Sequence, residues 1–241
     1  MMHIYLVRHG QSHVNLTDLT ADHRDEPLTD VGVAQARAVA DYLAETLTVD
    51  RLIGSTVQRA RQTAVIIGER LQIEPRWDDR IREVGTVHPD GGPIPEERLE
   101  PYLPEMWGTL RPYEPVTENG ESWMQVRARV GSFIESLIPT PPRGAGRGVA
   151  APTTGADSLG VSVPGAGDVE GQEETVVVVC HAGVIEAVFE YVFEKGPWSV
   201  VAVETNNTGL THLQFAPAAN RPDWHLHFHN RIVHLRPDLI T

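Results

Sequence analysis

The chain has one cysteine, Cys180, among its 241 residues. A single thiol cannot build an internal disulfide framework, so the sequence favours a reducing compartment and predicts a cytoplasmic protein. The chain also lacks a run of about 18 apolar residues, the length that a membrane-spanning helix requires. The first residues show neither a basic segment nor a small-residue cleavage site, so we expect no signal peptide and no membrane partner.

Lysine is almost absent too, because Lys195 is the one lysine among the 20 basic residues. The formal net charge of -13 argues against nucleic-acid binding, which needs a basic surface. An acidic molecule also repels anionic ligands at long range. Any phosphate site must therefore be a local pocket of arginines, and the positions of a few arginines are more informative than their number.

Hydrophobic residues make up 41% of the chain, which suits a packed globular core. Patterns typical of strands occupy residues 3–7, 51–55, 72–75, 175–180, 210–215 and 224–235. Helical spacing of apolar residues occupies residues 28–47, 58–71, 119–138 and 183–193. Thr29 or Asp30 is the expected N-cap of the first helix. Strands that alternate with helices predict an α/β fold, here a three-layer α/β/α sandwich with a mostly parallel central sheet.

Two stretches lack this regularity. Residues 86–138 begin with a proline-rich segment that has no clear period, and we expect an irregular and partly helical cap there. Residues 139–174 are mostly glycine, proline, alanine and small polar residues, which bury too little surface to offset their ordering entropy, so we expect a flexible insertion. A linker between two domains is the rival interpretation. The apolar strand at 175–180 suits the middle of a sheet, which favours one domain over residues 1–241.

Two of the predicted strands end in the same way. The first leads into Arg8-His9-Gly10, and a later one leads into His181-Ala182-Gly183. Ligands of a parallel sheet lie beyond the carboxyl ends of its strands, and Arg59 reaches the same rim on the first turn of its helix. Backbone N–H groups after each histidine can also point at an anion. Two histidines and two arginines at one rim indicate phosphate handling.

A nucleophilic role suits His9. Guanidinium groups hold phosphate oxygens bidentately, and a neutral imidazole can attack phosphorus. We expect the adjacent Arg8 to lower the pKa of His9 below its usual value of about 6.5, which keeps the ring uncharged. A phosphohistidine intermediate divides one slow displacement into two easier steps and requires no metal. The leaving oxygen needs a proton, which Glu83 can supply if partial burial raises its pKa.

Each of these residues also has a purely structural interpretation. Arg8 could cap the edge of the sheet, and Asn15 could only form a turn. Glu83 could be a surface carboxylate that pairs with Arg80 or Arg82. The positions of these side chains at the rim of the sheet distinguish the structural roles from the functional ones.

Other reactive side chains favour structural roles. Cys180 lies inside an apolar strand and is expected in the core. Three alternating histidines could bind a metal, but no carboxylate or cysteine accompanies them, so we expect no metal site at His225, His227 and His229. Several residues could border a pocket or only pack within the cap and its surroundings, namely His13, His88, Tyr102, Trp107 and Tyr113.

The motifs taken together resemble a known family. Arg8-His9-Gly10-Gln11-Ser12 with Asn15 resembles the signature of the histidine phosphatase superfamily, also called the phosphoglycerate mutase-like superfamily. Ser55 and the run from Arg59 to Ala64 resemble its second motif. Three further matches follow in the expected order, at Glu83, at Gly120-Glu121-Ser122 and at His181-Ala182-Gly183. The resemblance covers nearly the whole chain outside residues 139–174.

The resemblance implies a role for each matched residue. His9 would be the phosphorylated nucleophile, and Glu83 would be the proton donor and later the base that activates water. The family pattern implies that phosphoryl oxygens are bound by Arg8, Arg59, His181 and Asn15, with the backbone of Ala182 and Gly183. Gln11 and Ser12 would contact the substrate. The implied chemistry uses no cofactor and takes a small-molecule phosphate ester, and similar proteins include homodimers.

The pattern RHGQS resembles the bacterial mutase and phosphatase branch of the family, with one departure. The mutases carry an arginine directly after the catalytic glutamate, but Val84 and Gly85 follow Glu83 here. The mutases also use a lysine and paired arginines of the cap, and residues 86–138 contain neither. We therefore expect a metal-independent phosphomonoesterase. A cofactor-dependent phosphoglycerate mutase is the alternative, and a non-catalytic phospho-ligand binding protein is the third candidate.

Overall fold

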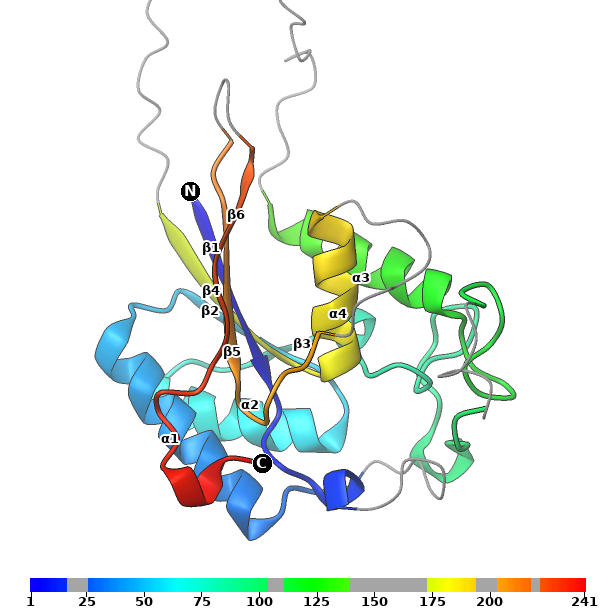
Figure 1. Cartoon of the computed structure of the whole chain (residues 1–241), viewed down its shortest axis with the longest axis horizontal. Helices are drawn as coiled ribbons and strands as arrows, with labels where there is room; N and C mark the ends of the chain where they lie inside the picture. Colours follow the sequence, from blue (N-terminus) through cyan, green and yellow to red (C-terminus); the bar gives the residue numbers. More distant parts are fainter. Residues whose placement is uncertain (17–25, 104–110, 139–172, 194–202, 218–221) are drawn as a thin grey trace, which may run out of the picture.

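The computed structural model describes residues 1–16, 26–103, 111–138, 173–193, 203–217 and 222–241. The strands in this part of the chain are β1 (Met2–Arg8), β2 (Arg51–Gly54), β3 (Arg76–Trp77), β4 (Glu174–Cys180), β5 (Leu210–Phe215) and β6 (Trp224–Arg231). They form one six-stranded sheet in the order β3-β2-β4-β1-β5-β6 (Figure 1). The first four strands of this order run parallel, and β5 and β6 are antiparallel to their neighbours.

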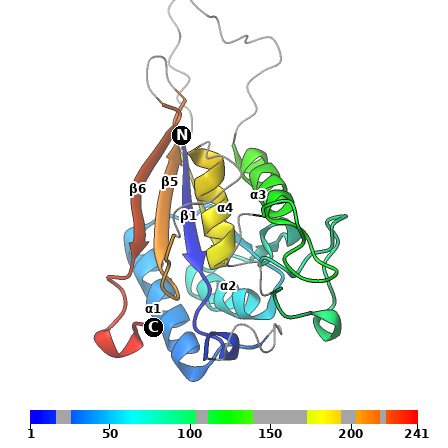
Figure 2. The same ribbon diagram turned by 45° about the vertical axis from the view of Figure 1, so that its right-hand side comes forward.

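Helices cover both faces of the sheet. The α-helices of the described residues are α1 (Asp30–Thr46), α2 (Gln58–Leu71), α3 (Trp123–Leu137) and α4 (Ala182–Val192). Short 3-10 turns add η1 (His13–Leu16), η2 (Asp79–Ile81), η3 (Glu96–Arg98) and η5 (Pro237–Leu239). One hydrophobic cluster joins the sheet to α1 and α2, and a second joins it to α3 and α4. The predicted three-layer α/β/α sandwich is confirmed (Figure 2).

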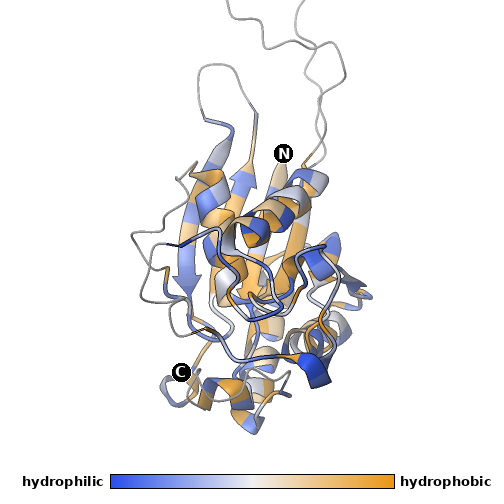
Figure 3. Cartoon of the chain, turned by 90° about the vertical axis from the view of Figure 1, so that its right-hand side faces the viewer, coloured by the Kyte–Doolittle hydropathy of each residue, from blue (hydrophilic) through white to orange (hydrophobic). Residues whose placement is uncertain are grey.

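Strand β4 shows why the sheet carries a core on each face. Successive side chains of a strand point to opposite faces. Val176 and Val178 belong to the cluster with α3 and α4, whereas Val177 and Val179 belong to the cluster with α1 and α2. An unbroken run of valines is therefore the pattern of a strand that is buried on both sides. The central strands are mostly hydrophobic, and the edge strand β6 is mostly hydrophilic (Figure 3).

Local capping fixes where two of the helices begin. The Thr29 side chain accepts a hydrogen bond from the Gly32 N–H, which makes Thr29 the N-cap of α1 as predicted. Ser122 forms a reciprocal capping box with Gln125 at the start of α3, so the helix start expected at Gly120-Glu121-Ser122 is confirmed.

The strand predicted at residues 72–75 is wrong, because β3 comprises Arg76 and Trp77. Gln72 ends α2 in the left-handed conformation, with φ at 57°. The N–H of Ile73 still bonds to the carbonyl of Gly68, so the chain leaves the helix over these residues and joins the sheet only later.

The segment predicted as a flexible insertion lies almost wholly outside the described residues, which exclude 139–172. Its predicted end is one residue too late, because β4 begins at Glu174. Strand β1 precedes this segment and β4 follows it. The two strands pair in parallel along their whole length, from Met2↔Glu174 to Arg8↔Cys180, so the chain on both sides of the segment contributes to one sheet.

The cap is irregular, as expected, over residues 86–103 and 111–118. Its regular structure within these ranges is the η3 turn and two isolated bridges, Val87↔Pro93 and Pro115↔Ser122. Trp107 lies outside the described residues. Among the helices that are described, none is long and apolar enough to cross a membrane.

Candidate active site

Side chains that follow parallel strands converge at one rim of the sheet. His9 follows β1 and His181 follows β4, and the β1–β4 pairing ends with Arg8 opposite Cys180. The two imidazole centroids lie 5.1 Å apart, and both rings are buried. Arg59, on the first turn of α2, donates its Nε–H to Nε2 of His9 at 3.1 Å. The lower end of α4 in Figure 1 lies at this same carboxyl end of the sheet.

The hydrogen bonds of His9 define its tautomer. Nδ1 lies 2.7 Å from the carbonyl oxygen of Gly10, and a carbonyl can only accept, so Nδ1 carries the proton. Nε2 then holds the lone pair that accepts the Arg59 N–H. Burial, followed by the charges of Arg59 and Arg8, holds the pKa of His9 well below its usual value. The structure thus provides a neutral imidazole whose free nitrogen faces a guanidinium.

A serine fixes the second imidazole. Nε2 of His181 lies 2.9 Å from Oγ of Ser55, and that oxygen also accepts the Val57 N–H at 3.3 Å. A Ser55 hydroxyl that donates its proton to Nε2 leaves the ring proton of neutral His181 on Nδ1. That Nδ1 is buried and has no hydrogen-bond partner among the described residues. Burial and the Arg59 charge also lower the pKa of His181.

Arg8 supplies a second buried donor. Its Nη1 donates to the carbonyl oxygen of Thr205, and its Nε has no partner in the part of the chain that the structure describes. Strand β1 lies between β4 and β5, so Arg8 does not cap the edge of the sheet. An anion with several oxygens suits the side chains of Arg8, Arg59 and His181, which offer it donors and positive charge.

Glu83 lies beside the second imidazole. Its Oε1 accepts the N–H of Val84 at 3.0 Å, and its Oε2 is 3.9 Å from Nδ1 of His181. The side chain is 13% exposed, so it is not a surface carboxylate. Arg80 pairs with Asp78, at 2.6 Å, rather than serving Glu83.

Close packing against α4 holds the Glu83 loop. A side-chain Cβ at Gly183 would lie 2.5 Å from Cγ2 of Val84 and 2.7 Å from Oε1 of Glu83. Position 183 therefore requires glycine, because a methyl group would push the carboxylate away from the histidines. The first turn of α4 also begins here, with His181 as the N-cap residue and Ala182 as the first helical residue.

Arg129, a residue that the sequence did not indicate, supports this loop from α3. Arg129 makes two hydrogen bonds of 2.7 Å to the carboxylate of Glu121, which is buried, and the Arg129 side chain is 10% exposed. The same guanidinium donates to the carbonyl of Arg80 at 2.7 Å and to the carbonyl of Glu83 at 3.4 Å. Glu121 belongs to the motif Gly120-Glu121-Ser122, but nothing in the spacing of the sequence identifies Arg129 as its partner.

The side chains of the first motif bind mainly to one another and to α1. Ser12 donates its N–H and its hydroxyl to Oδ1 of Asn15, at 3.0 and 3.2 Å, so Asn15 does form the turn considered above. The side-chain oxygen of Gln11 accepts the Thr29 hydroxyl at 2.8 Å. The backbone N–H of Gln11 donates to Gln35 at 2.7 Å.

Comparison with known proteins agrees with this geometry. The model of the histidine phosphatase superfamily, branch 1, matches residues 4–151, which is more than half of the chain. The chain belongs to this superfamily. The matched stretch includes the first histidine motif, Arg59 and Glu83, and it ends before His181.

Curated relatives of this histidine phosphatase include mutase names. It is 32% identical over 146 residues to a probable phosphoglycerate mutase GpmB of Enterobacter sp. strain 638. The same name belongs to a protein of Salmonella choleraesuis strain SC-B67 that is 29% identical over 146 residues. Both alignments cover 58% of this chain and 65% of the relative, so the match spans slightly less than two thirds of those proteins.

Solved structures with the same fold carry phosphatase names. A mycobacterial glucosyl-3-phosphoglycerate phosphatase superposes with a TM-score of 0.63 at 22% identity, covering 95% of this chain and 98% of that one. A phosphoserine phosphatase from Entamoeba histolytica gives a TM-score of 0.64 at 20% identity, covering 98% and 100%. At these identities the likeness establishes the fold alone.

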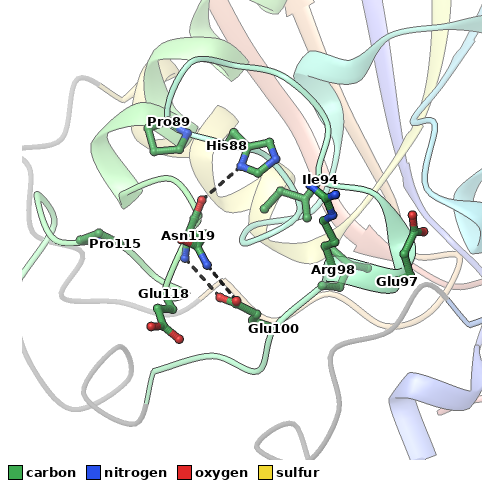
Figure 4. A pocket seen from close by; sticks show the side chains of 11 residues that line it. His88, Pro89, Ile94, Glu97, Arg98, Glu100, Pro115, Glu118 and Asn119 are labelled. Atoms are coloured by element: carbon green, nitrogen blue, oxygen red, sulfur yellow. Dashed lines mark hydrogen bonds between the residues drawn. The ribbon is translucent and has the colours of Figure 1, made fainter.

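The histidine phosphatase fold also holds a cavity within the cap, of about 700 Å³ (Figure 4). None of the residues of the histidine rim lines it. Asn119 donates its backbone and side-chain N–H groups to Glu100, and His88 contacts the carbonyl of Asn119. The cavity is lined by His88, Pro89, Ile94, Glu97, Arg98, Leu99, Glu100, Pro115, Glu118, Asn119 and Gly120.

The remaining candidates have structural surroundings. Burial raises the pKa of Cys180, which is wholly inside the core. Tyr102 is buried and donates its hydroxyl to the carbonyl of Val84, whereas Tyr113 is exposed. His13 is exposed on η1. Within the described ranges, no group of three or more histidine, cysteine or acidic residues is arranged to hold a metal ion.

Proposed function

We propose that the chain is a metal-independent phosphomonoesterase that hydrolyses a small phosphorylated metabolite through a phosphohistidine on His9. The observation that carries this proposal is the neutral tautomer of His9, whose Nε2 lone pair faces Arg59 and a second buried imidazole. A nucleophile that is uncharged at neutral pH needs no base to remove its proton before attack. A protein that only binds a phosphorylated ligand would need the cationic side chains of Arg8 and Arg59 but not this nucleophile.

The proposed reaction has two displacements. Nε2 of His9 attacks phosphorus and forms the phosphorus–nitrogen bond, while the bond to the ester oxygen breaks and Glu83 gives that oxygen its proton. Glu83, now a carboxylate, takes a proton from water, and the resulting hydroxide attacks phosphorus. The phosphorus–nitrogen bond then breaks, inorganic phosphate leaves, and both side chains return to their starting states.

Positive charge and fixed N–H donors would stabilise the transferring group. Arg8 and the Nδ1–H of His181 contribute buried donors, and Arg59 moves its Nε–H from His9 to a phosphoryl oxygen when His9 attacks. Asn15, the backbone of Ala182 and Gly183, and contacts from Gln11 and Ser12 complete the proposed binding set. The N-terminus of α4 favours an anion at the same place.

Two features favour hydrolysis over the mutase alternative. Val84 is a core residue packed against Gly183, so the position after Glu83 supplies no cation. Residues 86–138 contain no lysine and no pair of adjacent arginines, the cap cations that the resemblance gives to the mutases. The mutase nevertheless stays the second candidate, because relatives whose alignments cover 58% of this chain carry that name.

Further parts of the proposal extend the sequence expectations. We propose one domain over residues 1–241, with the cap at 86–138. The proposed partner is a small-molecule phosphate ester, with no cofactor, no metal, no nucleic acid and no membrane. We also propose a cytoplasmic location, which the single cysteine favours, and assembly as a homodimer.

Replacing His9 with alanine tests the proposed function. Purified wild-type protein should hydrolyse p-nitrophenyl phosphate in the presence of EDTA and incorporate acid-labile phosphate. His9→Ala should lower kcat by at least about 1000-fold and abolish the acid-labile phosphate, because the nucleophile is gone. His13→Ala, a neighbouring exposed histidine, is the matched control and should retain the wild-type rate. Unchanged turnover in His9→Ala would contradict the proposal.

A second assay separates the hydrolase from the mutase. The wild-type protein is incubated with 3-phosphoglycerate and a trace of 2,3-bisphosphoglycerate. Net formation of 2-phosphoglycerate without phosphate release would establish the mutase instead. A panel of sugar phosphates, phosphoglycerates, nucleotides and phosphopeptides then identifies the preferred ester, and binding without turnover of any of them would favour the phospho-ligand binder.

A further inference from the structure

We propose that Asn207 is a positioning residue that couples the backbone of the nucleophile to the amide of Asn15. The inference deepens the proposed function and rests on it. Asn207 lies in the loop before β5, a segment in which the sequence shows no motif, and it is 3% exposed. Its side chain reaches a residue that is 198 positions away in the chain.

The amide nitrogen of Asn207 bridges two parts of the first motif. Nδ2 donates to the carbonyl oxygen of His9 at 3.0 Å and to Oδ1 of Asn15 at 3.3 Å. A primary amide has two N–H groups, one for each of these acceptors. One side chain therefore sets the distance between the nucleophile's peptide and a residue proposed to bind the phosphoryl group.

The orientation of Asn15 follows from the donors around it. Its Oδ1 receives the Ser12 N–H, the Ser12 hydroxyl and the Asn207 amide. An atom that faces two N–H donors, from the Ser12 backbone and the Asn207 amide, must be the oxygen, because an NH2 group there would oppose both of them. The NH2 of Asn15 therefore points away from these donors, and it is the end of the amide that can donate to a phosphoryl oxygen.

Asn207 is itself held in place by the C-terminal segment. Its Oδ1 accepts the hydroxyl of Thr241 at 3.2 Å, and Gln35 donates to that hydroxyl at 2.9 Å. Gln35 in turn accepts the Gln11 N–H, which returns the network to the first motif. A buried amide with every polar atom paired has one stable orientation, and this suits a positioning role.

The neighbouring Asn206 offers a matched control. It bonds to Asn230 through its backbone N–H and its Oδ1, and its Nδ2 donates to the carbonyl of Thr241. Asn206 therefore anchors the same loop, but these hydrogen bonds go to Asn230 and Thr241 and not to His9 or Asn15. A loosened loop should affect the variants of Asn206 and Asn207 alike, whereas a loss of positioning at His9 and Asn15 should affect only the variant of Asn207.

The experiment compares Asn207→Ala with Asn206→Ala, using p-nitrophenyl phosphate turnover and thermal unfolding. Both variants should show a similar fall in Tm. Asn207→Ala should lower kcat by about 10- to 100-fold, because a misplaced Asn15 loses its hydrogen bond to the charged phosphoryl group. Asn206→Ala should stay within about 2-fold of the wild-type kcat. An equal loss of kcat in the two variants, or none in Asn207→Ala, would overturn the inference.

A double-variant cycle tests the route through Asn15. Asn15→Ala, Asn207→Ala and the double variant are compared for kcat and for inhibition by inorganic phosphate. If Asn207 acts by orienting Asn15, the fold-decrease of kcat in the double variant is smaller than the product of the fold-decreases in the two single variants. Fully multiplicative losses would contradict that route. A wild-type protein without turnover would count against the proposed function, and the same cycle measured on phosphate binding would still decide the role of Asn207.

Discussion

At the scale of single residues, the site depends on two buried imidazoles, each held by a hydrogen bond to a neighbouring residue. The sequence predicted a neutral His9 because Arg8 is its neighbour. The structure agrees on the direction of the pKa shift, but burial of the His9 ring is its largest cause, Arg59 the second and Arg8 only the third. Burial of a ring depends on the whole fold, so the adjacent residue was the only cause that the sequence could supply.

Ser55 provides a prediction at this scale. If the Ser55 hydroxyl donates to Nε2 of His181, Ser55→Ala removes the bond that keeps the ring proton on Nδ1, so the ring should populate the other tautomer and lose a donor to the phosphoryl group. We expect kcat to fall about 10- to 100-fold. Nitrogen-15 NMR of the histidine side chains should show a changed protonation pattern for His181.

Ser132→Ala is the control for Ser55, because Ser132 is exposed on α3. It should leave the rate and the spectrum of His181 unchanged. An unaltered tautomer in Ser55→Ala would remove the assigned role of the serine.

At the scale of elements, the Glu121–Arg129 pair connects α3 to the loop that carries Glu83. The sequence correctly predicted the helix from its apolar spacing, and the motif match at Gly120-Glu121-Ser122 lies directly before its first residue. It could not predict that Arg129 reaches the carbonyls of Arg80 and Glu83, because this contact depends on how α3 packs on η2. The same reason explains why Asn207 was missed, since a loop without a period gives no sign of its distant partner.

Breaking the buried pair should destabilise the protein strongly. Arg129→Met leaves the Glu121 carboxylate buried without its partner, and we expect a loss of about 3 kcal/mol in the free energy of unfolding. The double variant Glu121→Gln with Arg129→Met should recover part of that loss. Urea unfolding measures both variants.

Arg111→Met provides the comparison for an exposed ion pair, because Arg111 and Glu114 are both more than half exposed. Its effect should be below about 1 kcal/mol. Equal effects of Arg129→Met and Arg111→Met would show that the buried pair has no special importance.

At the scale of the whole molecule, the alternation of strands and helices was sufficient to predict the sandwich. The closing strands carry a feature that the sequence did not reveal, a histidine cluster that joins β1, β5 and β6. Nδ1 of His3 lies 2.9 Å from Nε2 of His212, whose ring stacks on His227 at 4.4 Å between centroids. The sequence suggested grouping the histidines of β6 with one another, but the sheet register brings histidines of three strands together.

The cluster predicts a dependence of stability on pH. Burial, followed by the neighbouring His227 and His3, lowers the pKa of His212 to about 4. Unfolded histidine titrates near 6.5, so the unfolded chain binds more protons as the pH falls from about 6.5 to about 4. The free energy of unfolding should therefore decrease across this window on acidification and change no further through His212 below it.

His212→Gln should make that decrease smaller by about 1 to 2 kcal/mol, less than the full shift implies because water reaches part of the cluster. Urea unfolding at several pH values between 7 and 4 measures the slope. His13→Gln, on the exposed η1 turn, should keep the wild-type slope. A slope that His212→Gln does not change would exclude this residue as the source.

The central claim is that Nε2 of His9 carries the phosphoryl group during turnover. The most direct measurement traps the enzyme by rapid quenching during turnover, maps the modified peptide by mass spectrometry and identifies the substituted nitrogen by phosphorus-31 NMR. We predict phosphate on Nε2 of His9, because Nδ1 is hydrogen-bonded to the carbonyl of Gly10. Phosphate on any other residue, or on Nδ1 of His9, would contradict it.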